Sequence, residues 1–419
     1  MNNSAPFTGD LFYYFAATFL YITAAILYGV NFFFKKKLNL FGRITAFIGL
    51  AVQTAGMIIR WITTGHPIFI SLYEMLLWFA WGAILIMLIA ELKFKYKDLG
   101  FFVLPFVVII MGILLLMPVK GSGTVVPALQ SVWLYIHVAV AIVSYAAFLI
   151  GFAAAIMYFI KKNVKPSWFA FWVSIFTAVM LLLINKGEII TGRSLNIYLQ
   201  SEGHPFLAEA FKDVGLILFL SFILFILSSI IHFIVSVTIT KKSEKKTLAV
   251  LGKIVFSSGA FGMFIGLLLL VLHLAKHQTL KITSSPAILA FLLSAFIITA
   301  FCVLLVYKYG IFQDRLPGEE LLDNLQYYSV SFGFPFLTLT IITGAFWANK
   351  AWGSYWGNDP KEWAAAVTWI VYAAYLHMRM TRGWSGIKAA VILVIGFAAV
   401  IFTLLGVTYL APGGLHSYV

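Results

Sequence analysis

Residues 131–160 read SVWLYIHVAVAIVSYAAFLIGFAAAIMYFI, an apolar run without Asp, Glu, Lys or Arg. About 20 apolar residues suffice to cross a bilayer as a helix, so this run predicts a spanning helix that projects beyond the hydrocarbon. Similar runs recur from end to end, which predicts an all-α, polytopic transmembrane helical bundle of about twelve helices. The expected spans are 11–34, 40–60, 72–92, 99–118, 131–160, 168–184, 214–240, 248–272, 287–309, 325–347, 363–380 and 384–411.

The composition excludes several classes of protein. The 419 residues are 62% hydrophobic and 11% charged, whereas soluble domains are roughly 45–50% apolar and about 25% charged. A soluble single core is therefore excluded, and so is disorder, which needs low hydrophobicity. The one cysteine, Cys302, excludes an intrachain disulfide and a dithiol redox pair. The chain has no P-loop and no G-x-S-x-G motif, which argues against nucleotide hydrolysis and acyl transfer.

The net charge of +14 is explained by topology rather than by a nucleic acid partner. Lys and Arg concentrate in alternate loops, and cytoplasmic loops of membrane proteins carry that excess. We therefore expect the N- and C-termini outside and the basic loops inside, where they face the anionic lipid of the bilayer. The basic loops are those with Lys35–Lys37, Lys93–Lys97, Lys161–Lys165, Lys241–Lys253 and Arg379–Lys388.

Tryptophan is concentrated in one segment. Five of the twelve tryptophans fall between Trp347 and Trp369, and residues 347–363 read WANKAWGSYWGNDPKEW. An aromatic belt at the membrane interface is one explanation, but it does not account for the glycines, aspartate and proline between the indoles. Flat indoles beside flexible backbone could form a platform for a large planar ligand such as haem. Lys350 and Lys361 could then neutralise the ligand's carboxylates. These residues alone leave both interpretations open.

Three histidines are candidates for binding iron. His137 follows Trp133 by four residues and shares its helix face. His416 follows the last span, and both are expected on the same side as the tryptophans. Two neutral imidazoles on opposite sides of a haem would give a bis-His iron, although a lone interfacial histidine is more often structural. His377 is expected roughly 22 Å below the outer surface. An ionisable residue at that depth is a functional candidate. The alternatives are a hydrogen bond between helices, or a side chain that snorkels inward beside Arg379.

Glu74 lies one turn into the span 72–92. A carboxylate there is favoured by the helix dipole, and an internal ion pair or a substrate role is the other possibility.

Residues 347–379 resemble the tryptophan-rich "WWD" signature of haem-handling proteins, most closely the CcsA/ResC family of system II cytochrome c biogenesis. The resemblance covers roughly residues 40–160 and 320–419. The family usually has Trp-x-Trp-Asp, where this chain has Asn358, and Glu-Thr-Trp, where Trp363 follows Glu362 directly. The other matching segments are Ser71–Glu74, Leu129–His137, Ser144–Ala147 and Gly414–Tyr418.

The resemblance implies a function. The chain would move haem, as haem b in transit, across the membrane and present it to the Cys-x-x-Cys-His thiols of apocytochrome c. It would be the haem-binding part of a cytochrome c synthase complex, with a CcsB/ResB-like membrane protein as partner. The membrane would be the bacterial cytoplasmic membrane, or the thylakoid membrane in a plastid. By resemblance His137 and His416 ligate haem outside, and His377 holds it in transit. The expected haem-binding residues are His137, His416, His377, Trp352, Trp356, Asp359, Trp363, Trp133 and Lys361.

Compact members of that family have eight helices, so residues 166–310, with four expected spans, are interpreted as an inserted membrane subdomain. It would separate N-terminal helices (1–165) from the C-terminal haem-handling region (311–419). Two other functions remain open from the sequence: a haem and quinone electron-transfer subunit, and a transporter of small solutes.

Overall fold

The described part of the chain is helical. The computed structural model describes residues 9–116, 127–165, 167–168, 223–235, 250, 252–262, 264 and 286–407, and these parts contain no β-strand. The chain divides into two compact units. One combines Met1–Lys162 with Arg315–Val419, and the other is Asn163–Asp314. The predicted division at 165 and 310 into a core and an inserted subdomain stays a prediction.

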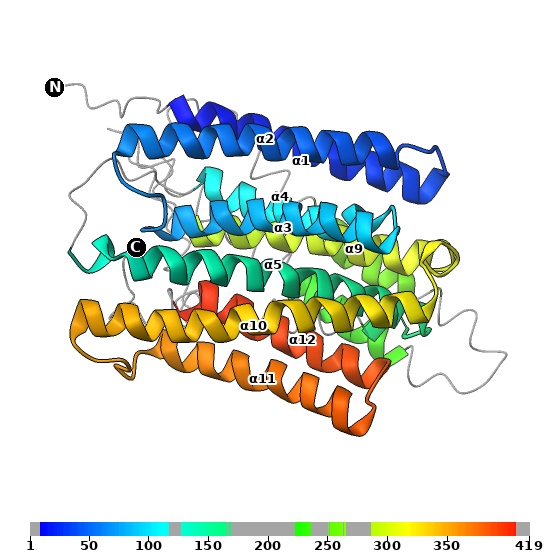
Figure 1. The fold of residues 1–419 in the computed structure, drawn as a ribbon. Helices are drawn as coiled ribbons and strands as arrows, with labels where there is room; N and C mark the ends of the chain where they lie inside the picture. The colour runs from blue at the N-terminus through cyan, green and yellow to red at the C-terminus, as the bar shows by residue number, and fades with distance from the viewer. Residues whose placement is uncertain are drawn as a thin grey trace, which may run out of the picture. The chain divides into compact units, whose positions relative to one another are not determined.

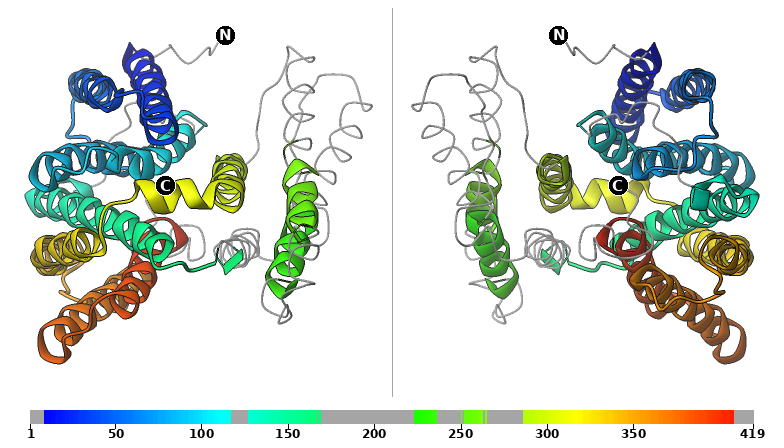
Figure 2. Two further views of the ribbon diagram at one scale, coloured as in Figure 1. Left: turned by 90° about the vertical axis from the view of Figure 1, so that its right-hand side faces the viewer. Right: turned by 90° about the vertical axis from the view of Figure 1, so that its left-hand side faces the viewer.

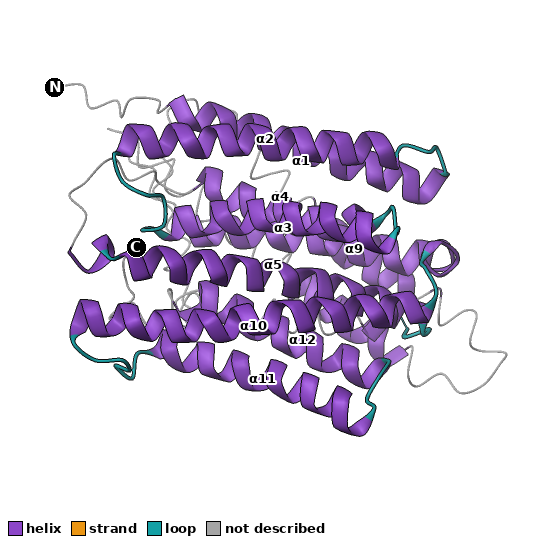
Figure 3. Ribbon diagram, viewed as in Figure 1, coloured by secondary structure: helices purple, strands orange, loops and turns teal. Residues whose placement is uncertain are grey.

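The first unit is a bundle of long helices (Figure 1, Figure 3). At the centre of the bundle, α5 packs along α10. α3 and α12 also pack on α5, and α1 packs on α2 and α4. In the end-on views of Figure 2, α10 lies between α5 and α11. The helices are α1 (Gly9–Phe34), α2 (Asn39–Thr64), α3 (Leu72–Phe94), α4 (Leu99–Leu116), α5 (Val132–Lys161), α10 (Glu319–Trp352), α11 (Pro360–Arg382) and α12 (Ile387–Ile401), with the short turns η1 (Pro127–Gln130) and η3 (Phe402–Gly406, π-helical).

Six helices of the described part are long and apolar enough to cross a membrane: Gly9–Phe34, Asn39–Thr64, Leu72–Phe94, Val132–Lys161, Glu319–Trp352 and Ile387–Leu405. Helical class and membrane character are therefore confirmed. The count of twelve spans and the placement of both termini outside stay predictions. The expected spans 99–118, 168–184, 214–240, 248–272 and 384–411 fall wholly or partly outside the described residues.

α10 is the helix of the first unit that most exceeds its apolar run, since it extends beyond the predicted span 325–347 at both ends. α9 (Pro286–Arg315) is kinked at Lys308, close to the end of the predicted span 287–309. Apolarity marks only the part of a helix that lies in hydrocarbon. Acidic residues in its first turn favour the start of α10, and Gly353, with φ of 77°, ends it in the left-handed conformation. Trp347 and Trp352 are consequently helical, and the connection to α11 is short.

The second unit has an apolar cluster of its own. Its described helical parts are most of α9 and segments 223–235 and 252–262. Cys302 is buried in the cluster, as expected for a cysteine in an apolar run. The cluster consists of Phe225, Phe256, Ala260, Cys302 and Val306.

The described cations of the first unit gather at one end of the bundle, where α1, α3, α5 and α11 end and α2, α4, α10 and α12 begin. The opposite end holds Arg60, Lys350 and Lys361 within the described part of this unit. This is the asymmetry that the positive-inside pattern needs. We call the end with Arg60, Lys350 and Lys361 the cation-poor end.

Candidate functional site

A cavity of about 150 Å³ lies at the cation-poor end of the first unit. The start of α3, the start of α5, the end of α10, the start of α11 and the turn η3 all contribute to it. Three of the predicted site residues line it: His137, Trp356 and Lys361. Most of the other walls are apolar, and Tyr145, Thr340 and Glu362 add polar groups.

The ring of His137 is fixed by a hydrogen bond across two helices. Its Nδ1 donates to the carbonyl oxygen of Thr340 on α10, at 2.8 Å. This places the proton on Nδ1 and the lone pair on Nε2. Histidines that bind metals almost always donate their other ring N–H to a carbonyl, carboxylate or water, which orients the ring. His137 therefore has the tautomer that suits iron.

Gly344 leaves the space in which this ring lies. A Cβ at Gly344 would be 2.8 Å from Nδ1 of His137 and 2.9 Å from Cε1, too close for a side chain. Trp347, one turn further along α10, lies beside the imidazole with ring centroids 6.0 Å apart and planes at 29°. Its Nε1 donates to the carbonyl of Ala128 at 2.8 Å. Glycine and tryptophan on α10 thus hold the histidine of α5.

Asp359 begins α11. Its carboxylate accepts from the backbone N–H of Lys361 at 2.8 Å, and Glu362 accepts from the N–H of Asp359 at 3.1 Å and of Gly357 at 2.9 Å. With Pro360 following, this is a capping box, which pairs backbone donors that a helix start leaves open. Asp359 is only 4% exposed. The structure gives this residue a capping function, and its predicted contact with haem stays a prediction.

The indoles do not form one flat platform. Trp356 and Trp363 meet edge to face, with planes at 89°, and Trp347 and Trp352 are tilted by 58°. Trp363 on α11 is 54% exposed. Trp133 stacks on Phe346, at 4.8 Å between centroids. Among the predicted tryptophans, Trp356 lines the cavity, whereas Trp352 packs beside it against the cluster around Trp347.

The two other predicted histidines lie away from this cavity or beyond the described part. His377 is exposed on α11, in the half of the helix that is farther from the cation-poor end. It is 16 residues beyond Lys361, or about 24 Å along the helix. His416 lies outside the described residues. No group of three or more His, Cys, Asp or Glu side chains in the described part could hold a metal ion.

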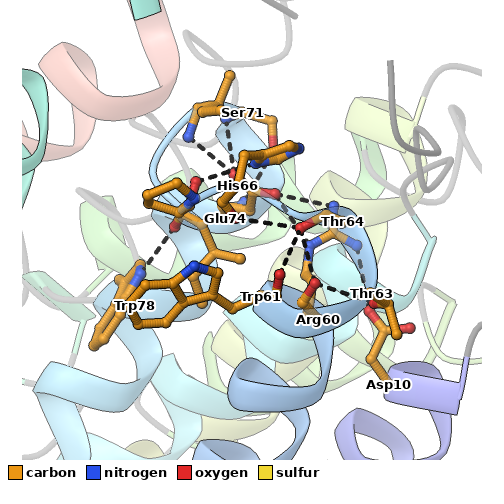
Figure 4. Close-up of polar contacts among 12 residues, drawn as sticks. Asp10, Arg60, Trp61, Thr63, Thr64, His66, Ser71, Glu74 and Trp78 are labelled. Carbon is orange, nitrogen blue, oxygen red and sulfur yellow. Dashed lines mark hydrogen bonds and ion pairs between the residues drawn. The ribbon is translucent and has the colours of Figure 1, made fainter. Parts of the chain in front are cut away.

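One polar cluster near the cavity was not predicted (Figure 4). Arg60 on α2 forms ion pairs with Asp10 at 3.3 Å and Glu74 at 3.0 Å, and all three side chains are buried. Glu74 also forms a capping box with Ser71 at the start of α3. Both possibilities considered for Glu74, helix start and ion pair, are therefore realised. The signal for the cluster was Arg60, a cation at the end of an apolar run.

Comparison with known proteins gives the family. A family model described as "Cytochrome C assembly protein" matches residues 69–415. Proteins named "Cytochrome c biogenesis protein CcsA" are similar over most of their length. The one from Trichormus variabilis is 33% identical over 394 residues, covering 89% of this chain and 91% of the relative. The one from Gloeobacter violaceus is 31% identical over 376 residues, covering 88% and 84%. This chain therefore belongs to the cytochrome c assembly protein family.

Proposed function

We propose that the chain binds haem as cargo at the cavity beside His137 and presents it there for attachment to apocytochrome c. The observation that supports this most strongly is the hydrogen bond between Nδ1 of His137 and the carbonyl oxygen of Thr340. The Nδ1 proton is committed to Thr340, so Nε2 is the nitrogen that would reach iron. Cytochrome c assembly requires haem, and the His137 imidazole would be a ligand of the haem iron.

The cavity has the chemistry for haem, although not the volume to enclose one. Its walls are mainly apolar, as a porphyrin ring requires, and polar groups are few. Pockets that enclose drug-sized ligands measure about 300–1,000 Å³, well above the 150 Å³ here. Tyr355 and Trp356 on the connection before α11 are 56% and 39% exposed. This connection is the part of the cavity wall that would move to admit a haem.

Lys361 is the cation that would pair with a haem propionate. It lines the cavity, whereas Lys350 on α10 is exposed and does not. A lysine ammonium is a mobile point charge, and charge-assisted hydrogen bonds to carboxylates are roughly twice as strong as neutral ones. The second axial ligand would be His416, as the family resemblance implies.

His377 would hold haem in transit together with a histidine of a CcsB/ResB-like partner. The supporting observation is the exposed face of α11, on which Val367, Ile370 and His377 follow each other at helical spacing. An exposed histidine among apolar side chains can be reached by a second membrane chain. The membrane would be the bacterial cytoplasmic membrane, or the thylakoid membrane in a plastid.

Attachment needs little chemistry from this chain. Each thiol of the apocytochrome adds across a vinyl group, so a C–S bond forms at one vinyl carbon and the other carbon takes the proton. His137, Lys361 and the walls of the cavity would hold the macrocycle in place. Proximity and orientation would then supply most of the rate.

The test uses the full chain, purified with and without its partner. Haem absorbance should fall in a His137→Ala/His416→Ala double variant, because both axial ligands are removed. The matched control is His66→Ala, since His66 lies in the connection between α2 and α3 and does not line the cavity. Unchanged haem absorbance in the double variant would remove the proposed outer site.

A further inference from the structure

Glu74 lies between a buried cation and one wall of the cavity. Its Oε1 accepts from Nε of Arg60 at 3.1 Å and is 3.0 Å from Nη2. Its Oε2 accepts from the backbone N–H of Ile70 at 2.9 Å and of Ser71 at 3.3 Å. Glu74 is 1% exposed. One carboxylate oxygen therefore holds the arginine while the other holds the segment before α3 (Figure 4).

That segment, residues 68–71, forms part of the cavity wall. Ile70 lines the cavity. Phe69 stacks on Trp78, at 5.2 Å between centroids, and its ring is 5.8 Å from that of Tyr135. Tyr135 lies on α5, two residues before His137. Trp78 also donates to the carbonyl of Ile68 at 2.9 Å. The segment is therefore fixed to α3, and it contacts α5, the helix that carries His137.

Arg60 holds Glu74 in turn. Its guanidinium also pairs with Asp10 on α1, at 3.3 Å, and lies 4.9 Å from the centre of the Tyr73 ring. A planar guanidinium presents donors in a fixed fork, so one arginine can serve two carboxylates at once. The ends of α1, α2 and α3 are thus joined beside the cavity. Removing one partner of such a buried pair leaves the other charge uncompensated.

We propose that Glu74, held by Arg60, is a positioning residue for the haem site. It sets the place of residues 68–71, and through Phe69 and Ile70 it sets the shape of the cavity next to His137. Glu74 does not itself line the cavity. This inference rests on the proposed function, because it concerns the same cavity.

The chain offers a matched control on the same helix. Glu91, near the other end of α3, is also 1% exposed. It accepts from Arg43 at 3.0 Å, from Tyr28 at 2.9 Å and from the backbone N–H of Gly100 at 3.2 Å. It does not line the cavity. Glu91→Gln therefore reports the cost of losing a buried carboxylate that pairs with an arginine. Glu74→Gln reports such a cost together with any effect on the cavity.

The experiment compares both variants with the unmodified full chain, and it measures thermal stability, haem affinity and the absorption spectrum of bound haem. Glu74→Gln should weaken haem binding about tenfold, the lower end of the cost of altering groups that orient metal ligands. It should also shift the spectrum. Glu91→Gln should lose stability to a similar extent and keep the spectrum and affinity of the unmodified chain.

Two results would overturn the inference: an unchanged spectrum and affinity in Glu74→Gln, or equal changes in both variants. If Glu74→Gln does not fold, Arg60→Lys decides. This variant keeps the contacts of Glu74 with Ile70 and Ser71 but replaces the forked guanidinium with a single ammonium group. The haem spectrum should therefore shift in the direction expected for Glu74→Gln, but by less. An unshifted spectrum in Arg60→Lys would overturn the inference. If haem bound to the unmodified chain does not depend on His137, the proposed function itself fails and the inference fails with it. If haem depends on His137 but not on Glu74, the inference alone fails.

Discussion

His137 on α5 donates a hydrogen bond from Nδ1 to the carbonyl oxygen of Thr340 on α10, with the two atoms 2.8 Å apart. The contact joins two helices that pack along each other. It orients the imidazole at a cavity wall and leaves the lone pair on Nε2.

Gly344→Ala should displace His137. The new Cβ would be 2.8 Å from Nδ1, so the ring must shift and the bond to Thr340 must lengthen. Overpacking of this kind costs about 1–3 kcal/mol of stability, and we expect haem absorbance to fall as well. Gly333→Ala on the same helix is the control, because its Cβ would meet Phe148 at 2.8 Å and Phe148 does not line the cavity. Equal haem absorbance in the two variants would argue against the displacement.

Lys361→Gln should weaken the binding of haem about tenfold, since a hydrogen bond to a charged group contributes about 1.5–3 kcal/mol. Titration of the purified chain with haem, followed by absorbance, measures this effect. Haem dimethyl ester, which lacks the carboxylates, should bind the variant and the unmodified chain equally. Lys350→Gln is the control, because Lys350 is exposed. A tenfold loss for the ester too would show that Lys361 does not act through the propionates.

Asp359→Asn and Asp359→Ala separate capping from charge. Asparagine caps helices about as well as aspartate, whereas alanine at a helix start costs about 1 kcal/mol. We therefore expect Asp359→Asn to keep the thermal stability and haem binding of the unmodified chain, and Asp359→Ala to lower both. If the asparagine variant loses as much haem as the alanine variant, the charge itself takes part in binding.

Asn358→Ala should destabilise the connection before α11. Asn358 has φ of 56°, a left-handed conformation that costs an ordinary residue roughly 1–2 kcal/mol and asparagine or glycine less. Its Oδ1 also accepts from Nε1 of Trp356 at 3.2 Å. Asn358→Gly should keep more stability than Asn358→Ala in a thermal melt. The reverse order would show that the side-chain bond matters more than the backbone.

The helices of the first unit could be predicted from the sequence because apolar runs of spanning length have few alternatives in a bilayer. The ends of α10 could not, since its polar first turn and the residues up to Trp352 are helical without being apolar. Hydropathy indicates how many residues of a helix lie in the hydrocarbon of the bilayer. It does not indicate how far the helix continues beyond the hydrocarbon.

Three of the nine residues predicted to bind haem, His137, Trp356 and Lys361, line one cavity, and their binding of haem stays a prediction. Gly344 makes room for the His137 imidazole only because α10 packs on α5. No local sequence pattern predicts that packing. Asp359 and Glu362 carried a readable capping signature, yet their place among tryptophans favoured a ligand platform.

The backbone at Asn358 suits the residue that stands there. The left-handed backbone suits asparagine and disfavours an indole. The sequence alone does not give this backbone conformation, which is a property of the folded connection.

Whether His137 binds iron is tested by the absorption spectrum of haem bound to the purified chain with His137→Gly, recorded with and without added imidazole. Our account predicts that the variant loses the spectrum of the unmodified chain and that imidazole restores it, because the free ligand can take the place of the missing ring. His66→Gly should keep the original spectrum without imidazole. A His137→Gly spectrum identical to that of the unmodified chain would contradict the account.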